Sequence, residues 1–592
     1  MLRSMKRILS VVALILVLAT VALALEFPKI DHHPAPGDFH RGFLESMPRF
    51  DPANTSAWQV DLRGSNLSRL DLRGAGVSLE HAVFDDKTIW PAPDRLPKDF
   101  DRARIVELGR NPGLGVRSLH AQGITGRGVG IAIVDSPLLT EHQEYAARLR
   151  LYEEINAYPN TEAHMHGCAV ASLAVGKTVG VAPGADLYFI GSWPMDPGPD
   201  PNQEGPLNLA PYARAVRRIL QINDQLPAER KIRVVSLSLG WEPGQTGSTE
   251  ITKAADEAKV QGMLVICSSV ERIHGFKFHG LGRDVRSAPD DFASYRPARW
   301  ATQGYTSHDR LLVPMDARAT ASPTGKDEYA FYAEAGWSWC IPYLAGTYAL
   351  AAQVDPKVTP ERFWALAMKT GRTIEAKYNG KTGSLGPILD PARLVAALQR
   401  GDLSDKAAVA AELAKYSAPS PRDQAPARDS DNRVSADFAA RIARLDIDRA
   451  SRRDVIEQLG QPRGFYASGK QLPDPNNLPS RYVMLYPAGV QVSMSADRVR
   501  SLLFDRPGYR WRNQIEVGTR IEDVVKVLGS PRKTIENARG ADVGRMQLED
   551  GAFYKDIDGV PGTCAYHVPS QGVSLYFIDN CVRQMIVLPK GQ

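Results

Sequence analysis

The sequence of 592 residues has few cysteines, little net charge and no long basic run, and each shortage argues against a class of protein. Lys and Arg number 72 against 67 Asp and Glu, and a net charge of +5 is too small for this length to predict nucleic-acid binding. The five cysteines have no spacing typical of zinc sites, so no metal site is predicted. With 43% hydrophobic and 23% charged residues, the chain is an ordinary globular one, long enough for several domains.

The cysteines fall into two groups. Cys168, Cys267 and Cys340 lie within apolar stretches, where each is expected to be a small buried hydrophobic residue. For Cys168 the alternative is a thiol nucleophile. Cys564 and Cys581 flank a strand–turn–strand pattern near the C-terminal end, and they are the candidate disulfide if the compartment is oxidising.

The N-terminal residues 1–25 hold the longest apolar run, from Ile8 to Leu25, after three basic residues among the first seven. A basic start, an apolar run and the small-x-small triplet at residues 22–24 are typical of a secretory signal peptide. A run of about 18 apolar residues is also long enough to stay as a membrane anchor. On both alternatives we expect the rest of the chain to be exported, that is periplasmic, secreted or membrane-anchored.

Residues 26–57 are rich in proline and predicted to be irregular, and a five-residue rhythm follows over residues 58–92. Its apolar positions, five residues apart, are Leu62, Leu67, Leu72 and Val77. This rhythm resembles the pentapeptide-repeat family, which implies a short right-handed β-coil with these side chains inside. About five units are too few to bury their faces alone, so we expect the coil to lean on the next domain. The alternative is an irregular loop with chance periodicity.

Residues 100–400 alternate between short apolar runs and helical patterns. Nearly continuous apolar runs are typical of buried parallel strands, and their alternation with helices predicts a doubly wound α/β sheet. The strands are expected at residues 131–134, 186–190, 233–239 and 263–267, and helices at residues 212–221 and 250–262.

The remaining C-terminal part is predicted to be a linker, residues 401–440, followed by two α+β repeats, residues 441–510 and 511–592. Both repeats contain Asp-Val-x-x-x-Leu-Gly-x-Pro, at residues 454–462 and 523–531, and Gly and Pro after the last apolar residue are a helix stop. A short helix followed by antiparallel strands resembles the SmpA/OmlA (BamE-like) and β-lactamase-inhibitor-protein types of repeat. We expect binding or spacing there, since the repeats contain no catalytic constellation.

Three polar residues stand at the edges of apolar elements in the order acid, imidazole, hydroxyl. They are Asp135 in GVGIAIVDS, His166 in HMHGCAVASLAVG and Ser338 in AGWSWCIPYLAGTYALAA. A serine is a weak nucleophile until a histidine accepts its proton, and a carboxylate fixes the tautomer of that histidine. The order Asp, His, Ser is that of subtilisin, and it differs from the orders in chymotrypsin and the α/β-hydrolases.

These motifs resemble those of the subtilisin-like serine peptidase (subtilase) family over about half of the chain. The resemblance implies that Asp135 is the acid, His166 the general base and Ser338 the nucleophile, with no organic cofactor. It also implies that extended peptide pairs with the strand around SLSLG, a β-augmentation mode of binding. The implied substrate-binding residues are Ser236, Leu237, Ser238, Leu239, Gly240, Ser268 and Ser269.

The sequence departs from the family at the oxyanion position, where Val270 replaces the usual Asn. Valine donates no hydrogen bond, and the loss of one such donor costs about 3–4 kcal/mol of transition-state stabilisation. The backbone N–H of Ser338 remains as a donor, and Ser269 or Ser268 is a substitute if the loop is displaced. Trp337 and Trp339 also flank Ser338 where the family has Thr and Met.

Two candidate metal sites were weighed against simpler structural roles. The acidic residues Asp284, Asp290 and Asp291 form either a structural calcium site or a solvated loop. His164 and His166 are two residues apart and do not share a helix face, so an orienting hydrogen bond is expected instead of a metal pair.

We therefore predict a multidomain, exported serine endopeptidase that hydrolyses protein or peptide substrates through an acyl-enzyme. The alternative is a catalytically impaired subtilase-fold scaffold that binds peptides or envelope proteins.

Overall fold

The computed structural model describes residues 26–592 apart from several gaps, and the chain divides into two compact units, residues 1–420 and 421–592. Unit 1 denotes the described residues up to 417, and unit 2 those from 434 onward. The predicted signal peptide or anchor, residues 1–25, lies outside the described residues. In the described ranges no helix combines the length and apolar character needed to cross a membrane. The gaps after residue 26 are residues 53, 55–56, 158–160, 198–203, 243–244, 300–307, 379–380, 418–433, 468–469, 473–477, 487–489, 505–507, 513, 537–549, 556–562, 579–580 and 590–592.

Unit 1 contains a six-stranded sheet in which every pair of neighbours is parallel. The predicted parallel α/β sheet is therefore confirmed. One strand comes from the segment predicted to be irregular, because Lys29–Ile30 pairs with Leu151 and Tyr152 at the sheet edge. In spatial order the strands are β1 (Lys29–Ile30), β7 (Leu149–Glu154), β8 (Asp186–Gly191), β6 (Gly130–Asp135), β11 (Ile232–Leu237) and β12 (Leu264–Cys267).

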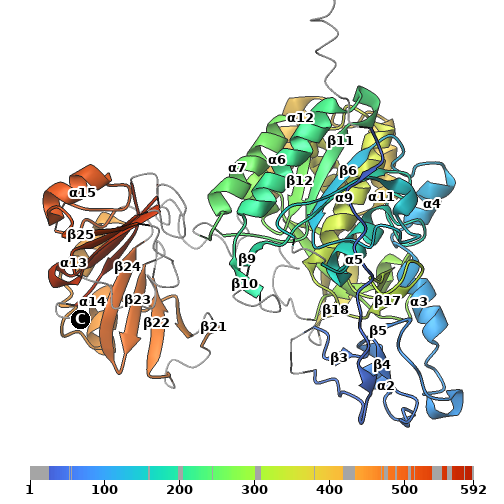
Figure 1. The fold of residues 1–592 in the computed structure, drawn as a ribbon, viewed down its shortest axis with the longest axis horizontal. Coiled ribbons are helices and arrows are strands. Elements are labelled where there is room, and N and C mark those ends of the chain that lie inside the picture. The colour runs from blue at the N-terminus through green and yellow to red at the C-terminus, as the bar shows by residue number, and fades with distance from the viewer. Residues whose placement is uncertain are drawn as a thin grey trace, which may run out of the picture. The chain divides into compact units, whose positions relative to one another are not determined.

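Helices cover both faces of this sheet, as the alternation of apolar residues along β6 requires (Figure 1). Ile131 and Ile133 belong to the core that contains helices α5 (Met165–Val175) and α9 (Trp337–Val354). Ala132 and Val134 belong to the core under α6 (Ala210–Gln225) and α7 (Ser248–Val260). The three cysteines predicted to be buried, Cys168, Cys267 and Cys340, lie fully inside these cores.

The described part of unit 1 also contains a five-stranded sheet, a four-stranded sheet and two two-stranded sheets. The five-stranded sheet has the order β14 (Tyr295–Pro297), β13 (Phe278–Arg283), β15 (Leu311–Pro314), β19 (Lys381–Ile388) and β18 (Arg372–Tyr378). The four-stranded sheet has the order β16 (Arg318–Ala321), β17 (Tyr329–Tyr332), β5 (Ala82–Asp85) and β3 (Val60–Asp61). The shorter elements are β2 (Gly42–Phe43), β4 (Ser65–Asn66), β9 (Met195–Pro197), β10 (Glu204–Leu207), α3 (Arg102–Arg110), α4 (Val116–Ala121), α8 (Val270–His274), α10 (Pro360–Thr370) and α11 (Pro391–Gln399). The two-stranded sheets pair β9 with β10 and β2 with β4.

The segment with the five-residue rhythm, residues 58–92, packs against residues 100–400, the catalytic segment, through the four-stranded sheet. Its strands β3 and β5 join β17 and β16 in that sheet. Leu62, Leu67 and Leu72 are buried, as the rhythm predicts. Val77 departs from it, since this residue lies on helix α2 (Gly76–Glu80) and is 65% exposed, while Leu79 is buried in its place. The five-residue period therefore stops where the chain turns into α2, because a helix brings residues three or four apart onto one face.

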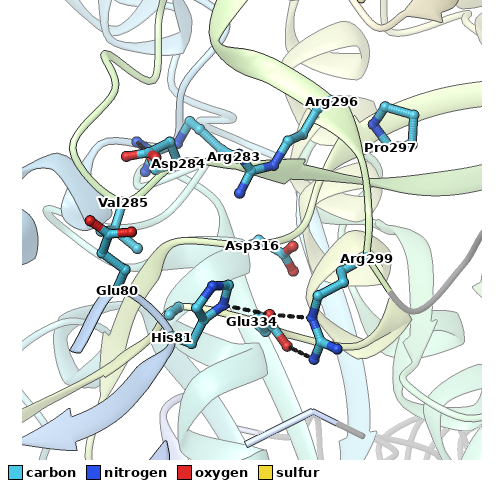
Figure 2. Close-up of a pocket in the computed structure, with 11 residues that line it drawn as sticks. Glu80, His81, Arg283, Asp284, Val285, Arg296, Pro297, Arg299, Asp316 and Glu334 are labelled. Atoms are coloured by element: carbon cyan, nitrogen blue, oxygen red, sulfur yellow. Dashed lines mark hydrogen bonds and ion pairs between the residues drawn. The ribbon is translucent and has the colours of Figure 1, made fainter. Parts of the chain in front are cut away.

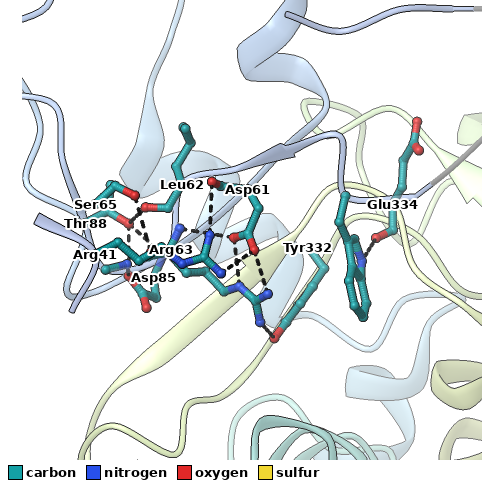
Figure 3. A network of polar contacts seen from close by, with 11 residues as sticks. Arg41, Asp61, Leu62, Arg63, Ser65, Asp85, Thr88, Tyr332 and Glu334 are labelled. Atoms are coloured by element: carbon teal, nitrogen blue, oxygen red, sulfur yellow. Dashed lines mark hydrogen bonds and ion pairs between the residues drawn. The ribbon is translucent and has the colours of Figure 1, made fainter. Parts of the chain in front are cut away.

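Arg63 fastens this segment to the catalytic segment (Figure 3). Its guanidinium donates to both carboxylate oxygens of Asp61, at 2.9 and 2.8 Å, and to the hydroxyl of Tyr332 at 3.2 Å. The same guanidinium lies over the rings of Phe39, Trp58 and Tyr332. A buried guanidinium is stable only when such partners replace its water shell, and here the ion pair and the rings supply them.

The predicted linker, residues 401–440, is too long at both ends. Helix α12 (Lys406–Ser417) belongs to unit 1, where Leu413 and Tyr416 pack against the main core. Helix α13 (Ala436–Ala443) belongs to unit 2, and its apolar residues Phe438 and Ile442 are buried. An alanine-rich stretch can be a packed helix as well as a linker, and composition does not separate the two.

Unit 2 is one ten-stranded sheet, and the two predicted repeats do not form separate domains. The strand order is β21-β20-β22-β23-β24-β29-β28-β27-β26-β25, and the halves join where Leu503 of β24 pairs with Ile586 of β29. The strands are β20 (Gly464–Ala467), β21 (Lys470–Gln471), β22 (Arg481–Leu485), β23 (Gln491–Ser495), β24 (Arg498–Phe504), β25 (Lys533–Glu536), β26 (Ala552–Lys555), β27 (Thr563–Val568), β28 (Val573–Ile578) and β29 (Cys581–Val587).

The two helices of unit 2 that the repeats predicted are α14 (Arg452–Leu459) and α15 (Ile521–Leu528). Each ends at the glycine of its motif, Gly460 or Gly529, with φ of 89° and 87°. A left-handed residue at this position favours glycine, which is why the motif stops both helices. Cys564 is buried on β27, but the side chain of Cys581 lies outside the described residues, so the disulfide stays a prediction.

Two buried arginines should respond in opposite ways to replacement by methionine. Arg63→Met leaves the half-buried Asp61 with Arg41 as its remaining partner, at 2.8 Å, and should lower the free energy of unfolding by about 1.5–3 kcal/mol, the usual worth of a hydrogen bond to a charged group. Arg318 on β16 is buried with a single hydrogen bond, Nη2 to the carbonyl of Val179 at 3.4 Å, and its Nε and Nη1 have no partner among the described residues. Burial lowers the pKa of Arg318 to about 10.

We expect Arg318→Met to leave the free energy of unfolding unchanged or to raise it, because it removes a poorly compensated buried charge. Hydrogen exchange of β16 and β17 peptides is the measurement, because these strands report on unit 1 alone. Faster exchange in Arg318→Met than in Arg63→Met would contradict the prediction that Arg63 stabilises unit 1 and Arg318 does not.

Candidate active site

The three predicted catalytic residues lie on elements of the same core of unit 1. Asp135 is the last residue of β6, and it is 3% exposed because β8 and β11 flank this strand. His166 is the second residue of α5, and Ser338 is the second residue of α9. Polar residues at the carboxyl ends of parallel strands and at the following helix starts commonly meet at one edge of such a sheet.

The contact between acid and base is formed. His166 Nδ1 lies 2.7 Å from Asp135 Oδ1, and the same oxygen accepts hydrogen bonds from the backbone N of Ser136 at 2.8 Å and from its hydroxyl at 3.1 Å. Burial by itself would lower the pKa of His166, but the charge of Asp135 and this hydrogen bond raise the pKa above the usual histidine value. The bond to Nδ1 leaves Nε2 as the nitrogen available to accept a proton.

The nucleophile is not bonded to this base. Ser338 Oγ donates to the backbone carbonyl of Ser238 at 3.2 Å, and the Ser238 hydroxyl donates in return to the carbonyl of Ser338 at 3.2 Å. No hydrogen bond joins Ser338 Oγ to His166 within the described part of the chain. Catalytic hydrogen bonds are often loose without substrate, so this geometry alone does not exclude the pair.

The two indoles beside Ser338 are accommodated by aromatic packing. Trp339 is buried, with its ring 5.8 Å from the ring of His166 and 5.1 Å from that of Tyr332, both edge to face. Trp337 is half-buried, and its ring lies 5.3 Å from the ring of Phe278. Trp339 therefore belongs to the core beneath the site and does not narrow a cleft as an exposed wall would.

Neither Val270 nor Ser269 offers a free side-chain donor at the oxyanion position. Val270 begins α8 and its side chain is buried in the main core. The Ser269 hydroxyl accepts from the backbone N of Trp241 at 2.8 Å and donates to the carbonyl of Trp241 at 2.9 Å. Ser269 was a predicted substitute donor, but its hydroxyl instead holds the loop around Trp241.

The predicted substrate strand must be shortened. Ser236 and Leu237 pair with β6 on one side and with β12 on the other, so their backbone groups are already used. The correction follows from the sheet order, which places β11 inside the sheet. Ser238, Leu239 and Gly240 follow β11, and exposure rises along them until Gly240 is fully exposed. The backbone N of Ser268 donates to Leu239 at 2.9 Å, which places Ser268 beside this segment.

One positioning residue, Ser136, was not identified from the sequence, whereas the hydrogen bonds of His164 agree with the orienting role expected for it. The Ser136 hydroxyl lies 3.0 Å from His164 Nδ1 and accepts from the backbone N of Gly167 at 3.0 Å. Burial, followed by the nearby His166, lowers the pKa of His164 to about 4, so its ring is neutral at pH 7. His164 also caps α5 by accepting from the backbone N of His166 at 3.4 Å. The signal in the sequence was Ser136 directly after the acid, a donor within reach of its carboxylate.

The three acidic residues that were weighed as a calcium site have hydrogen-bond partners within the protein. Asp290 accepts from Asn111 at 2.7 Å and from the backbone N of Gly115 at 2.8 Å, and Asp291 and Asp284 accept from backbone N–H groups. Among the residues the structure describes, no three acidic, histidine or cysteine side chains could hold a metal ion together. Burial raises the pKa of Cys168 to about 11, which keeps its thiol protonated.

Comparison with known proteins identifies related sequences for part of the chain. Residues 126–273 match the model of the subtilase family, Peptidase_S8, a stretch that includes Asp135 and His166 and ends before Ser338. The subtilisin-like protease PopC of Myxococcus xanthus (strain DK1622) is 36% identical over 184 residues, 25% of this chain and 38% of PopC. Subtilisin E of Bacillus subtilis (strain 168) is 23% identical over 340 residues, 54% of this chain and 81% of subtilisin E.

The chain thus spans less than two fifths of the length of PopC. Among solved structures, the prenylagaramide maturation protease PagA is 15% identical over 48% of this chain and 98% of that chain, with a TM-score of 0.34. The matched segment contains β6, α5, β8, α6, β11, α7 and β12, the elements of the parallel sheet and of the helices that position Asp135 and His166. Residues 126–273 therefore form a peptidase S8 subtilase domain with subtilisin-like relatives.

Proposed function

We propose that this protein is an exported serine endopeptidase that hydrolyses protein or peptide substrates through an acyl-enzyme on Ser338. The observation that supports the proposal most directly is the 2.7 Å contact between His166 Nδ1 and the buried Asp135 carboxylate. This contact holds the imidazole in one tautomer and raises its basicity, which is what activation of a serine requires. The N-terminal apolar run of residues 1–25 supports export.

The proposed reaction begins with rotation of Ser338. Its Oγ leaves the Ser238 carbonyl for another staggered rotamer and gives its proton to His166 Nε2 as it attacks the scissile carbonyl. The backbone N–H of Ser338 donates to the developing oxyanion. His166 then protonates the leaving amine, and a water molecule, deprotonated by His166, hydrolyses the acyl-enzyme and restores the free Ser338 hydroxyl.

A second candidate function is a peptide-binding scaffold with impaired catalysis. Two observations favour it, the hydrogen bond that turns Ser338 Oγ to Ser238 and the absence of a side-chain donor from Val270 or Ser269. One missing oxyanion donor lowers the rate by about 10²–10³-fold, which still leaves an enzyme but a slow one. The segment from Ser238 to Gly240 would then bind extended peptide without cleaving it.

Labelling with a fluorophosphonate probe separates the two candidates, because the probe reacts only with an activated serine. We expect the purified full chain to be labelled and Ser338→Ala to remain unlabelled. Ser238→Ala is the matched control, since it removes a neighbouring hydroxyl and keeps the nucleophile. A folded wild-type protein that is not labelled would refute the peptidase and leave the scaffold.

The pH dependence of labelling tests the state of His166. Only the neutral imidazole accepts a proton, so the labelling rate should fall as the pH decreases through the raised pKa of His166. The acid limb should therefore have its midpoint above the usual pKa of histidine. In Asp135→Asn, we expect a midpoint at lower pH and a rate about 10⁴-fold lower, because the charge is lost and the tautomer is wrong. A wild-type midpoint at or below the usual histidine value would contradict the acid–base pair.

A further inference from the structure

A pocket of about 230 Å³ lies in unit 1, between the end of helix α2 and the turn that leads to Ser338 (Figure 2). Its walls come from the end of β13, from β14 and the residues after it, and from the connections on both sides of the β16–β17 hairpin. The lining residues with charged or titratable side chains are Glu80, His81, Arg283, Asp284, Arg296, Arg299, Asp316 and Glu334.

Asp316 lines this pocket although it is only 6% exposed. Its Oδ1 accepts from the backbone N of Ala335 at 2.9 Å, while Oδ2 has no hydrogen-bond partner among the described residues. Gly282 lies beside Oδ2, and a side chain at that position would come within 3.2 Å of this oxygen. Because Asp316 lines the pocket, this oxygen is a place where a ligand would gain a hydrogen bond.

Asp316 is a hydrogen-bond donor at neutral pH. Burial raises its pKa to about 8, against the lowering by the Ala335 N–H and by Arg296 and Arg299, and Glu334 raises it further. A protonated carboxyl presents an O–H, which a ligand carboxylate accepts strongly. The other charged or titratable groups that line the pocket are Glu334 from the β17–α9 connection, Arg296 on β14 and Arg299 after it, Arg283 at the end of β13 and Asp284 after it, and Glu80 at the end of α2 and His81 after it.

Of the three arginines that line the pocket, one has no partner for its side chain among the described residues. Glu334 is compensated by Arg299, at 2.7 and 2.5 Å, and by His81 at 2.8 Å. Arg283 is held by three backbone carbonyls, among them Ala317 at 2.7 Å. Arg296 is exposed and has no ion pair or hydrogen bond in the described part of the chain. A donor from Asp316 beside an unpaired guanidinium offers two groups that can bind the oxygens of an anionic ligand.

The pocket is within reach of a peptide bound at Ser338. Glu334 precedes Ser338 by four residues, and four residues of extended chain span at most about 14 Å. A substrate strand advances about 3.3 Å per residue, so a side chain within about four residues of the scissile bond can enter the pocket. Ala335, which binds Asp316, lies one residue before Gly336, the N-cap of the helix that presents Ser338.

We propose that this pocket binds the carboxylate of an acidic side chain of the peptide substrate, through the Asp316 carboxyl group and the Arg296 guanidinium. The assignment to a substrate rests on the proposed peptidase function, whereas the binding of a carboxylate does not. It adds a specificity-determining site outside the predicted substrate strand.

The binding test uses the full chain and two probes of the same shape, N-acetyl-glutamate amide and N-acetyl-glutamine amide, titrated by calorimetry at pH 6.5. We expect the glutamate probe to bind about tenfold more tightly, the gain of one charge-assisted hydrogen bond. Arg296→Gln should remove this preference, whereas Arg127→Gln, which changes an exposed arginine away from the pocket, should keep it. Equal binding of both probes to the wild type, or an unchanged preference in Arg296→Gln, would overturn the proposal.

The pH dependence identifies Asp316 as the donor. Below a pH of about 8 Asp316 is protonated and donates, and above it the ionised carboxylate repels the ligand, so the preference should disappear as the pH rises. Asp316→Asn keeps a neutral donor of the same shape and should bind the glutamate probe equally at pH 6.5 and pH 9. A wild-type preference that persists at pH 9 would refute the role of Asp316, and Arg296→Gln decides the site if Asp316→Asn fails to fold.

Cleavage of peptides with a single Glu or Gln, placed at each of the four positions on either side of the scissile bond, tests the link to substrate. One position should show a higher kcat/KM with Glu, and Arg296→Gln should abolish that difference, whereas Arg127→Gln should keep it. No position preference together with intact probe binding would refute the substrate assignment alone. Absence of any cleavage would count against the proposed peptidase, while the probe titration would still decide the pocket.

Discussion

The hydrogen bond between His166 and Asp135 is the interaction on which the rest of the candidate site depends. It connects the end of a central strand to the start of a helix, so the sheet order, the burial of Asp135 and the capping of α5 all fix its geometry. A buried carboxylate is tolerated because it is held by charge-assisted hydrogen bonds, two of them from Ser136. The imidazole and the acid are therefore held in place by the core, whereas the Ser338 hydroxyl, on a single rotatable bond, is free to choose between Ser238 and the base.

The N-terminal segment contributes to the surroundings of this site more than its repeat-like sequence indicates. Arg63 binds the hydroxyl of Tyr332, the ring of Tyr332 packs on Trp339, and Trp339 packs on His166. The end of helix α2 in the same segment supplies two residues, Glu80 and His81, that line the pocket near the turn before Ser338. The segment and the catalytic segment share one sheet and one core, so the large aromatic residues that replace small ones beside Ser338 have packing partners.

The sequence predicted the parallel sheet and the pairing of Asp135 with His166 because both depend on local patterns, an apolar run that ends in an acid and a helix start with an imidazole. It did not predict that Ser236 and Leu237 are paired on both sides, since strand order is a non-local property. The partners of Ser269 and Ser338 were also hidden, because a hydroxyl hydrogen bond is chosen among neighbours that only the fold brings together. Asp316 gave no signal, as a single acid between two strands is ordinary in sequence and unusual only in its burial.

The pairing of β24 with β29 sets the order in which the ten-stranded sheet of unit 2 can be completed during synthesis. The strand β24, at residues 498–504, pairs on one side with β23 and on the other with β29, which is the last strand of the chain. While the ribosome makes the intervening residues, β24 is an open edge whose N–H and C=O groups can pair with another chain. The first half can form its own hairpins early, yet its edge stays uncovered until β29 has emerged, so a nascent chain stalled between β24 and β29 carries an aggregation-prone strand.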